Sequence, residues 1–395
     1  WPQALAETAA RLQQVIDQHG PQAVAFYASG QLLTEDYYAA NKLMKGFIGA
    51  ANIDTNSRLC MSSAVVGYKR AFGADAVPCS YADLEQTDLL IFVGSNAAWA
   101  HPVLYQRIAA AKQARPTMKV VVIDPRRTAT CDIADLHLAL APGSDAGLFV
   151  GLLNALSESL APETFDGQAQ ALAAAREWSV ARVAQFCGLP EAEVARFYDW
   201  FLRAPTAMTL YTMGINQSSS GSDKCNAIIN VHLASGHIGR PGCGPFSLTG
   251  QPNAMGGREV GGLANQLACH MGFDPADIAR LGRFWGSERI AQTPGLMAVE
   301  LFEAIGRGEV KAVWVMGTNP AVSLPDSDAV RQALARCELV MVSDITAQTD
   351  TAGFAHIRFP ALGWGEKNGT VTNSERRISR QRPFLPAPGE ARPDW

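Results

Sequence analysis

The sequence lacks closely spaced cysteines. Its eight cysteines are scattered singly, and no other cysteine lies within 18 residues of Cys60. The spacing of a zinc knuckle or an iron–sulfur cage is therefore absent around Cys60. Single, scattered cysteines also do not form the framework of a disulfide-rich secreted domain. They favour a reducing compartment, and we expect the protein to be cytoplasmic.

Long apolar runs, basic runs and common nucleotide fingerprints are also missing. No apolar run reaches the ~18 residues of a membrane span. Asp and Glu (37) slightly outnumber Lys and Arg (33), and the basic residues form no cluster. We therefore expect no membrane partner and no nucleic-acid partner. The absence of a G-x-G-x-x-G motif argues against ordinary NAD binding, and the absence of a P-loop disfavours a simple purine-nucleotide module.

What the chain does contain is an alternation of short apolar runs with helical patterns. At 395 residues it is long enough for two or three domains. The alternation predicts parallel sheets with right-handed crossovers. Nearly every predicted strand runs out into Gly, Ser, Thr, Asn or Asp, as expected where ligands bind at carboxyl ends of strands. The predicted strands are 23–28, 89–93, 119–123, 136–141, 206–211, 312–316, 339–342 and 357–359.

Two other stretches differ in composition. Residues 158–203 are rich in alanine, which predicts helices, and they carry no recognisable chemistry. Residues 218–262 are rich in Gly, Ser, Asn and Pro and are expected to be mostly loop. Long ordered loops are usually functional, so we expect this loop to contribute to a site.

One pattern occurs twice. Gly94-Ser95-Asn96 is followed 28 residues after its Asn by Asp124, and Gly317-Thr318-Asn319 is followed 25 residues after its Asn by Asp344. In a Rossmann-like unit the first strand end meets a pyrophosphate, and the acidic residue at the next strand end binds ribose or base. The pattern predicts two nucleotide-type sites. Simple strand-exit turns remain the alternative.

The stretch Asn56–Ser63 contains a cysteine among polar and small residues. The positive charge of neighbouring Arg58 favours the thiolate form of Cys60, which would then be a nucleophile or a single soft metal ligand. A buried structural cysteine is the alternative interpretation.

Five motifs carry a resemblance to a known family. They are Asn-Ser-Arg-Leu-Cys-Met-Ser-Ser at 56–63, Met-Gly-Ile-Asn-Gln at 213–217, Gly-Arg-Pro-Gly-Cys-Gly-Pro at 239–245, Gly-Gln-Pro-Asn-Ala-Met-Gly-Gly-Arg-Glu at 250–259 and Glu-Lys-Asn-Gly-Thr-Val-Thr-Asn-Ser-Glu-Arg-Arg at 366–377. On these motifs the chain resembles the molybdopterin oxidoreductases, which bind molybdenum through two molybdopterin guanine dinucleotides. Within that family it is most similar to the catalytic subunit of assimilatory nitrate reductases.

The resemblance implies site residues. Cys60 would ligate molybdenum, and Met213 and Arg258 would complete the catalytic set. Arg258 would recognise the substrate oxyanion; bracing of its loop through Glu259 is the alternative. The residues expected to contact the two dinucleotides are Gln31, Asn56, Val93, Gly94, Ser95, Asn96, Trp99, Asp124, Arg126, Thr128, Gly143, Ser144, Asp145, Met213, Gln217, Asn319, Ser343, Asp344 and Lys367.

The resemblance also implies an α/β fold with two Rossmann-like, doubly wound domains. Residues 56–204 would form one dinucleotide-binding domain, inserted into a second one built from 1–55 and 205–375. Residues 376–395 would be a linker towards a C-terminal domain. An N-terminal domain with a 4Fe–4S cluster and this C-terminal domain are expected to lie outside the sequence, and the piece alone is expected to be inactive and without bound cofactor.

The implied activity is the two-electron reduction of nitrate to nitrite by oxygen-atom transfer, with electrons from a donor protein or reductase subunit. Formate dehydrogenase or another molybdopterin oxidoreductase is one alternative. Formate dehydrogenases carry a histidine directly after the metal-ligating residue, whereas this chain has Met61, which cannot take up a proton. A non-catalytic subunit of a respiratory complex with the same fold is a second alternative.

Overall fold

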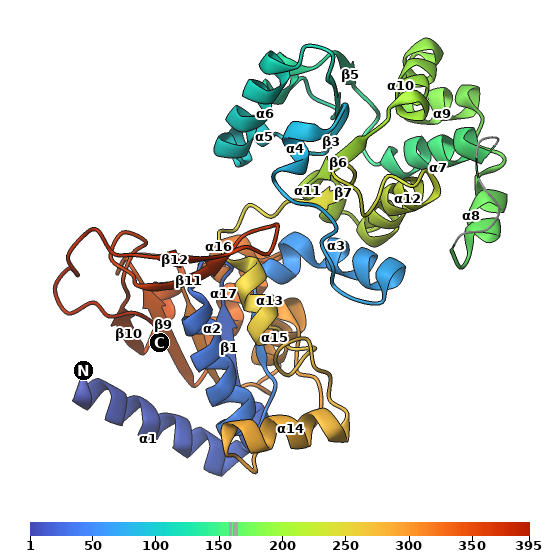
Figure 1. The fold of residues 1–395 in the computed structure, drawn as a ribbon. Helices are drawn as coiled ribbons and strands as arrows, with labels where there is room; N and C mark the ends of the chain where they lie inside the picture. The colour runs from blue at the N-terminus through green and yellow to red at the C-terminus, as the bar shows by residue number, and fades with distance from the viewer. Residues whose placement is uncertain (158–159, 161–164) are drawn as a thin grey trace. The chain divides into compact units, whose positions relative to one another are not determined.

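The computed structural model describes residues 1–157, 160 and 165–395. The chain forms two compact units (Figure 1). Unit 1 consists of residues 1–59 and 251–395, and unit 2 consists of residues 60–250. Unit 2 is therefore inserted into the chain of unit 1, as the sequence predicts for its two α/β domains.

Unit 1 contains a five-stranded sheet in the order β10-β9-β8-β1-β2, and every neighbouring pair is parallel. The strands are β1 (Val24–Ala28), β2 (Ile53–Thr55), β8 (Ala312–Met316), β9 (Leu339–Asp344) and β10 (Ile357–Pro360), and an antiparallel hairpin joins β11 (Gly369–Thr372) to β12 (Ile378–Gln381). The helices and turns are α1 (Pro2–His19), η1 (Pro21–Ala23), α2 (Thr34–Asn41), η2 (Lys42–Ile48), α13 (Ala254–Val260), α14 (Pro275–Trp285), α15 (Ala298–Gly306), α16 (Pro320–Ser323), α17 (Ser327–Arg336) and η5 (Thr351–Phe354).

The central strands β1 and β8 of unit 1 are apolar on both faces because both faces are covered. Tyr27 and Val313 point into a core that they share with Leu301 of α15 and other residues of α15 and α17. Phe26 points the other way, into a core that includes Leu12 of α1 and residues of α2. Side chains alternate along a strand, so one continuous apolar run fills two cores. This is the doubly wound arrangement.

Unit 2 repeats the design with the order β5-β4-β3-β6-β7, again parallel throughout. Its strands are β3 (Leu89–Val93), β4 (Lys119–Ile123), β5 (Leu136–Leu138), β6 (Ala207–Tyr211) and β7 (Gly244–Ser247). The helices and turns are α3 (Ser57–Phe72), which enters from unit 1, α4 (Asp83–Gln86), α5 (Ala97–Ala100), α6 (Pro102–Ala114), η3 (Ala129–Ile133), α7 (Asp145–Leu156), α8 (Gln168–Ala175), α9 (Val180–Cys187), α10 (Glu191–Arg203), α11 (Met213–Asn216) and α12 (Gly221–Ala234).

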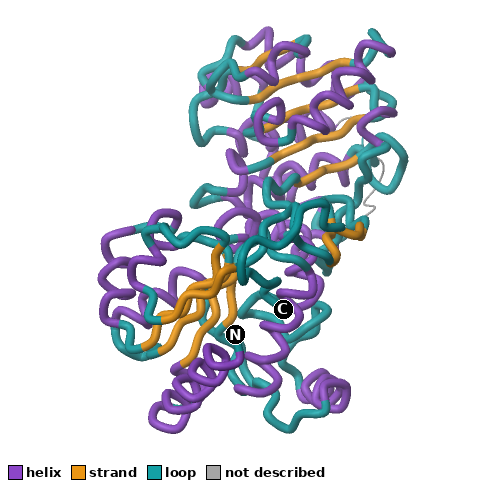
Figure 2. Tube along the Cα trace, turned by 90° about the vertical axis from the view of Figure 1, so that its left-hand side faces the viewer, coloured by secondary structure: helices purple, strands orange, loops and turns teal. Residues whose placement is uncertain are grey.

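Helices also lie on both faces of the sheet in unit 2, as Figure 2 shows for the orange strands and purple helices. Ile91 packs in the core that contains residues of α7, α9, α10 and α12. Phe92, the next residue, packs in the core that includes Ile108 of α6. Local signals set the helix ends: the Ser179 hydroxyl accepts from Arg182 N (3.3 Å) at the start of α9, and Gly188 ends it in a left-handed conformation.

The predicted helices in residues 158–203 are present as α8, α9 and α10. Residues 158–159 and 161–164 of that stretch lie outside the described part of the chain.

Two predicted boundaries differ from the structure. Residues 205–250 were assigned to the first domain, but β6 pairs with β3 and β7 pairs with β6, so this segment completes the sheet of unit 2. Residues 218–262 were expected to be mostly loop, yet they contain α12, β7 and α13. Tertiary packing overrides the low helix propensity of Gly, Ser and Asn in these helices.

The expected linker at 376–395 is also wrong, because this segment packs on unit 1. β12 pairs with β11, and the backbone of Arg392 bonds to Pro360 O (3.1 Å) and Leu362 N (3.1 Å). Arg392 Cζ lies over the Trp1 ring, 5.0 Å from the ring centroid. Within the described residues, no helix combines the length and apolar character needed to cross a lipid bilayer.

Two glycines approach each other closely in unit 2. Gly94 follows β3 with φ 55°, and Gly214 N donates to Gly94 O (3.1 Å). A Cβ atom at Gly214 would lie 2.5 Å from Gly94 Cα, which is backbone and cannot rotate away. This contact fixes how the turns after β3 and β6 meet.

We therefore expect Gly214→Ala to lower the free energy of unfolding by about 1–3 kcal/mol, the usual range for overpacking. Chemical denaturation followed by circular dichroism measures it. Gly250→Ala is the matched control, because its Cβ would meet only Met213 Cε at 3.8 Å. Equal denaturation midpoints for both variants would contradict the steric argument.

His232 gives a prediction of pH dependence. Its ring is fully buried, Nε2 lies 2.8 Å from Thr209 Oγ1 and Nδ1 lies 3.1 Å from His237 O. Burial, with the neighbouring His237, lowers the pKa of His232 from 6.5 to about 3. The unfolded chain therefore binds one more proton than the folded chain between these values, and stability falls as the pH falls from 6.5 towards 3.

His232→Gln removes this titration. The slope of the free energy of unfolding against pH, measured between pH 6.5 and 4.5, should flatten by about 1.4 kcal/mol per pH unit. An unchanged slope would mean that His232 is already protonated in the folded protein.

Candidate functional site

The two sheets place equivalent residues at their carboxyl edges. In each sheet one central strand, β3 or β8, has the next strand in sequence on one side (β4 or β9) and β6 or β1 on the other. The exit glycines Gly94 and Gly317 both have positive φ (55° and 61°). Each donates its N–H back to the neighbouring strand, to Ile123 O at 3.0 Å and to Ser343 O at 2.9 Å. The repeated motif in the sequence is therefore a repeated backbone turn.

The asparagines that follow are held in the same way. Asn96 Oδ1 accepts from Thr130 Oγ1 (3.0 Å), and Asn319 Oδ1 accepts from Thr351 Oγ1 (2.6 Å). Each asparagine is the N-cap of a short helix, α5 or α16, and each threonine belongs to a 3-10 turn, η3 or η5. Both threonines are completely buried, whereas both asparagines are half-buried.

The two aspartates also correspond. Asp124 Oδ1 accepts from Arg126 N (2.9 Å), and Asp344 Oδ1 accepts from Thr346 N (3.2 Å). Each carboxylate thus turns its own chain at the strand end. Burial raises the pKa of Asp344 above its ordinary value. The Arg126 side chain is 79% exposed and lies 3.9 Å from Asp124, so it extends into solvent beside that carboxylate.

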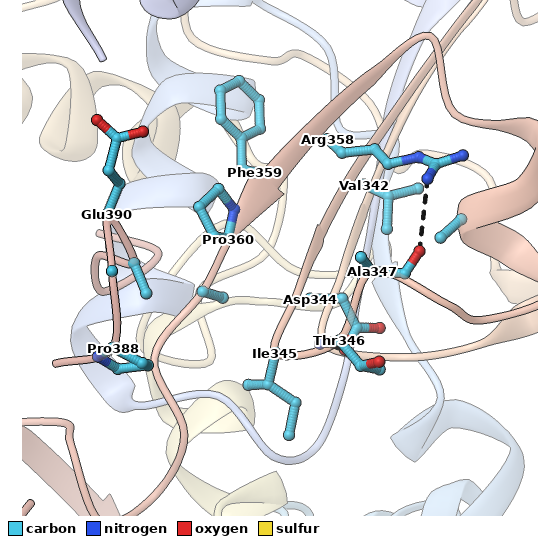
Figure 3. Close-up of a pocket in the computed structure, with 14 residues that line it drawn as sticks. Val342, Asp344, Ile345, Thr346, Ala347, Arg358, Phe359, Pro360, Pro388 and Glu390 are labelled. Carbon is cyan, nitrogen blue, oxygen red and sulfur yellow. Dashed lines mark hydrogen bonds between the residues drawn. The ribbon is translucent and has the colours of Figure 1, made fainter.

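Two pockets of unit 1 open at this edge, and Asp344 lines both. One, of about 230 Å³, brings together Gln31, Lys367 and Asp344 from distant parts of the sequence, beside Ser29 and Gly317. The other, of about 470 Å³, lies at the ends of β9 and β10. Figure 3 shows Pro388 and Glu390 on one side of the larger pocket and Asp344 on the other.

Lys367 is buried in a cluster with two carboxylates. Its Nζ lies 3.0 Å from Asp394 and 3.7 Å from Asp36, and its side chain is 7% exposed. Burial and the nearby Asp394 raise the pKa of Asp36 to about 6, against the opposing effect of Lys367. Lys367, which the sequence predicts to contact the cofactor, is therefore already paired with two carboxylates.

Asn56 connects the strand exits of unit 1. Asn56 Oδ1 accepts from Gly30 N (2.9 Å) and Gln251 Nε2 (2.6 Å), and its Nδ2 donates to Thr318 Oγ1 (3.2 Å). The side chain of Asn56 thus ties together the turns after β1, β2 and β8. Gln31 is exposed, and Ser343 Oγ accepts from Trp314 Nε1 (2.9 Å).

In unit 2 the predicted segment Gly143–Asp145 leads into α7. The Ser144 hydroxyl donates to Ala141 O (2.7 Å) instead of capping the helix by its side chain. Asp145 Oδ2 forms an ion pair with Lys224 Nζ at 2.6 Å, and both side chains are buried (9% and 3% exposed). Asp145 is therefore a structural anchor between α7 and α12.

The remaining predicted contacts of unit 2 differ in accessibility. Trp99 is 79% exposed, Gln217 is exposed, and Val93 is buried in β3. Ser95 Oγ and Thr128 Oγ1 are buried hydroxyls without a hydrogen-bond partner among the described residues. These two hydroxyls are donors that a ligand at this edge could use.

Cys60 lies in the first turns of α3, and its thiol is partly accessible. Its Sγ is 3.6 Å from Met213 Sδ, so two of the predicted catalytic residues are in contact. The Arg58 guanidinium donates to the buried Asp54 through Nε (3.0 Å) and Nη2 (2.9 Å). This pair fixes the start of α3.

Arg258 was expected in a glycine loop but lies on α13 and is buried. Its guanidinium contacts Met255 Sδ, and its carbonyl accepts from Gln266 Nε2 (2.7 Å). Glu259, through which the alternative role of Arg258 would act, forms ion pairs with His270 (2.8 Å) and Arg376 (3.1 Å).

Sequence reasoning missed Thr130, Thr351 and Lys224. The threonines follow their asparagines by similar distances, so comparing the two copies of the repeat could have revealed them. Nothing in the sequence pairs Lys224 with Asp145, since the contact spans the α7–α12 interface.

Two parallel sheets with glycine, asparagine and aspartate at their exits define a doubly wound α/β protein whose ligands bind at the carboxyl edges. A family model described as molybdopterin oxidoreductase matches residues 1–395. The chain belongs to the molybdopterin oxidoreductase family, which confirms the resemblance.

Known relatives agree in fold and sequence. The chain is 76% identical to a nitrate reductase of Klebsiella oxytoca, over all of this chain and 46% of the relative. It is 39% identical to a periplasmic nitrate reductase of Desulfovibrio desulfuricans, over all of this chain and 55% of the relative. The chain thus spans about half the length of these curated relatives. The structure of acetylene hydratase from Pelobacter acetylenicus has the same fold (TM-score 0.77, 19% identity, covering 99% of this chain and 56% of that one).

The Asp145–Lys224 pair gives a prediction on stability. Lys224→Met leaves a buried carboxylate without its partner and should lower the free energy of unfolding by about 3–5 kcal/mol. Asp145→Asn in the same chain should restore much of the loss. The control is Arg203→Met, whose partner Asp199 is 48% exposed and whose loss should cost no more than about 1 kcal/mol. Equal effects in urea denaturation would refute the structural role of Asp145.

Proposed function

We propose that this chain is the central cofactor-binding part of a molybdenum-dependent nitrate reductase of the assimilatory type. The observation that carries the proposal is the duplicated carboxyl edge: two equivalent Gly-Ser/Thr-Asn turns, each with an aspartate on the neighbouring strand. One dinucleotide for each edge is the ligand set that such a duplication accommodates. The 76% identity to a nitrate reductase supports nitrate as the substrate.

The residues present fit a pair of guanine dinucleotides. In unit 2 the buried hydroxyls of Ser95 and Thr128 offer donors to phosphate or pterin oxygens. In unit 1 the pocket that contains Gln31, Lys367 and Asp344 combines a cation with a carboxylate. A lysine suits phosphate, and a carboxylate suits the N–H groups of guanine. We assign Asp124 and Asp344 to the guanosine ends on this chemistry.

Cys60 is the proposed metal ligand. A partly accessible thiol is a soft donor suited to molybdenum, and the Met213 thioether packs against it at 3.6 Å. When bound, the cofactor supplies the two-electron oxygen-atom chemistry. The chain's own contribution is to hold the thiol at a fixed place, and the Asp54–Arg58 pair at the start of α3 does this. Arg258 remains our candidate for binding the nitrate anion.

Formate oxidation is disfavoured by the residue after Cys60. Met61 is buried (4% exposed), and its Sδ accepts from Asn216 Nδ2 (3.3 Å). It thus packs in the core of unit 2, and its thioether cannot take up a proton. A non-catalytic subunit would not need an accessible thiol with this packing, so we also disfavour that alternative.

The partners follow from the chemistry. Nitrate reduction consumes two electrons, so we propose an electron-donor protein or reductase subunit, with a 4Fe–4S cluster outside residues 1–395. All eight cysteines lie in the described part of the chain, and none of them forms a disulfide there. Cysteines without disulfides suit a reducing compartment, and we propose the cytoplasm.

Cys60→Ala in the full-length protein tests the proposal. Loss of the sulfur ligand should reduce nitrate reduction with an artificial electron donor to the level of a protein-free assay. Molybdenum content, measured by mass spectrometry, should fall in parallel.

Cys269→Ala is the control, because Cys269 is an exposed thiol in unit 1. It should keep both activity and molybdenum. Normal turnover of the Cys60 variant would refute the metal-ligand role. A wild-type protein that oxidises formate but does not reduce nitrate would refute the proposed substrate.

A further inference from the structure

We propose that Thr130 and Thr351 are positioning residues that set the orientation of the asparagine carboxamide at each dinucleotide edge. This inference rests on the proposed function and extends it to two residues outside the expected cofactor contacts. Each threonine fixes which end of the asparagine amide faces its own chain, and thereby which end is left for the ligand.

The geometry in unit 2 uses both capacities of one hydroxyl. Thr130 Oγ1 accepts from Ala98 N (3.1 Å) and donates to Asn96 Oδ1 (3.0 Å). The hydroxyl has one hydrogen, and Asn96 is its acceptor. If the amide were flipped, its NH2 group would face the hydroxyl and that hydrogen would lose its acceptor. The carbonyl oxygen of Asn96 is therefore directed to Thr130.

Unit 1 has the same arrangement with one further bond. Thr351 Oγ1 accepts from Ala321 N (3.2 Å) and donates to Asn319 Oδ1 (2.6 Å). The backbone N–H of Thr351 also donates to Asn319 Oδ1 (3.1 Å). A backbone N–H can only donate, so the oxygen of Asn319 is fixed at this position without ambiguity.

The repetition argues for a role beyond local folding. The two copies lie in different units, and in both the hydroxyl is fully buried while the asparagine is half-buried. In both cases the group turned away from the threonine is the NH2 of the carboxamide, which can only donate. Asn319 Nδ2 already donates to Asp350 Oδ2 (3.4 Å), so a ligand at this edge would share or replace that acceptor. The ligand group matched to both asparagines is an oxygen acceptor, a phosphate or ring carbonyl of the dinucleotide.

The test uses Thr130→Val and Thr351→Val in the full-length protein. Valine has nearly the shape of threonine without the hydroxyl, so the Asn96 amide becomes free to turn, whereas the Asn319 amide keeps its bond from the backbone N–H of residue 351. The guanosine content per chain, measured by chromatography of the GMP released by acid hydrolysis, should fall from two to about one in Thr130→Val. It should fall less in Thr351→Val, and the double variant should hold no more than about one. Molybdenum per chain should fall with it.

Thr130→Ser and Thr351→Ser keep the hydroxyl and should retain two guanosines. Thr209→Val is the matched structural control: Thr209 lies on β6 away from the turn, is equally buried, and bonds to His232 of α12. It should also retain two, whereas a general effect of losing a buried hydroxyl would lower its content as well.

The outcomes separate the two proposals. Wild-type protein without guanosine or molybdenum would remove the proposed function and this inference with it. Wild-type protein with two guanosines, together with unchanged content in both valine variants, would overturn the positioning role alone. A loss that serine does not restore, or that Thr209→Val reproduces, would overturn it too.

Discussion

Both main sheets are parallel throughout, and this constraint decides where polar chemistry can lie. A parallel sheet needs crossover helices on its faces, so its strands are buried on both sides and carry mostly apolar residues there. In β1, for example, the side chains of Tyr27 and Phe26 point into two different cores. The polar side chains are left to the carboxyl edge, where Asn96, Asp124 and their counterparts in unit 1 lie.

The carboxyl edges of the two sheets have the same backbone turns but differ in the charged residues near those turns. In unit 2 the carboxylate of Asp145 is balanced by Lys224 inside a helix interface. In unit 1 Lys367 faces both Asp36 and Asp394 in a pocket wall. The duplicated turns provide the same hydrogen-bond donors twice, whereas the surrounding charges make the two halves unequal. Two chemically identical ligands would thus meet different electrostatic surroundings.

Strands with a clean apolar run were predictable: β3, β4 and β8 occupy the predicted residues. The sheet that a strand joins could not be predicted. β6 has the same pattern as the strands of unit 1, and only its pairing with β3 places it in unit 2. Helices α12 and α13 were not predicted because their segments are rich in glycine and serine, and their stability comes from tertiary packing. Of the site, the strand exits could be predicted from composition, and Thr130 only by comparing the two copies of the repeat. Lys224 could not be predicted, because its contact with Asp145 joins two helices far apart in the sequence.

The insertion of unit 2 has a consequence for synthesis on the ribosome. β1 occupies residues 24–28, but its neighbour β8 begins at residue 312, after the whole of unit 2 has been translated. Unit 2 contains all five of its strands in one continuous stretch and can complete its sheet co-translationally. β1 and β2 meanwhile remain a nascent, half-paired fragment with an apolar edge. The later part of the chain thus has to pair with that fragment, so the sheet of unit 1 is completed only after β8 has been translated.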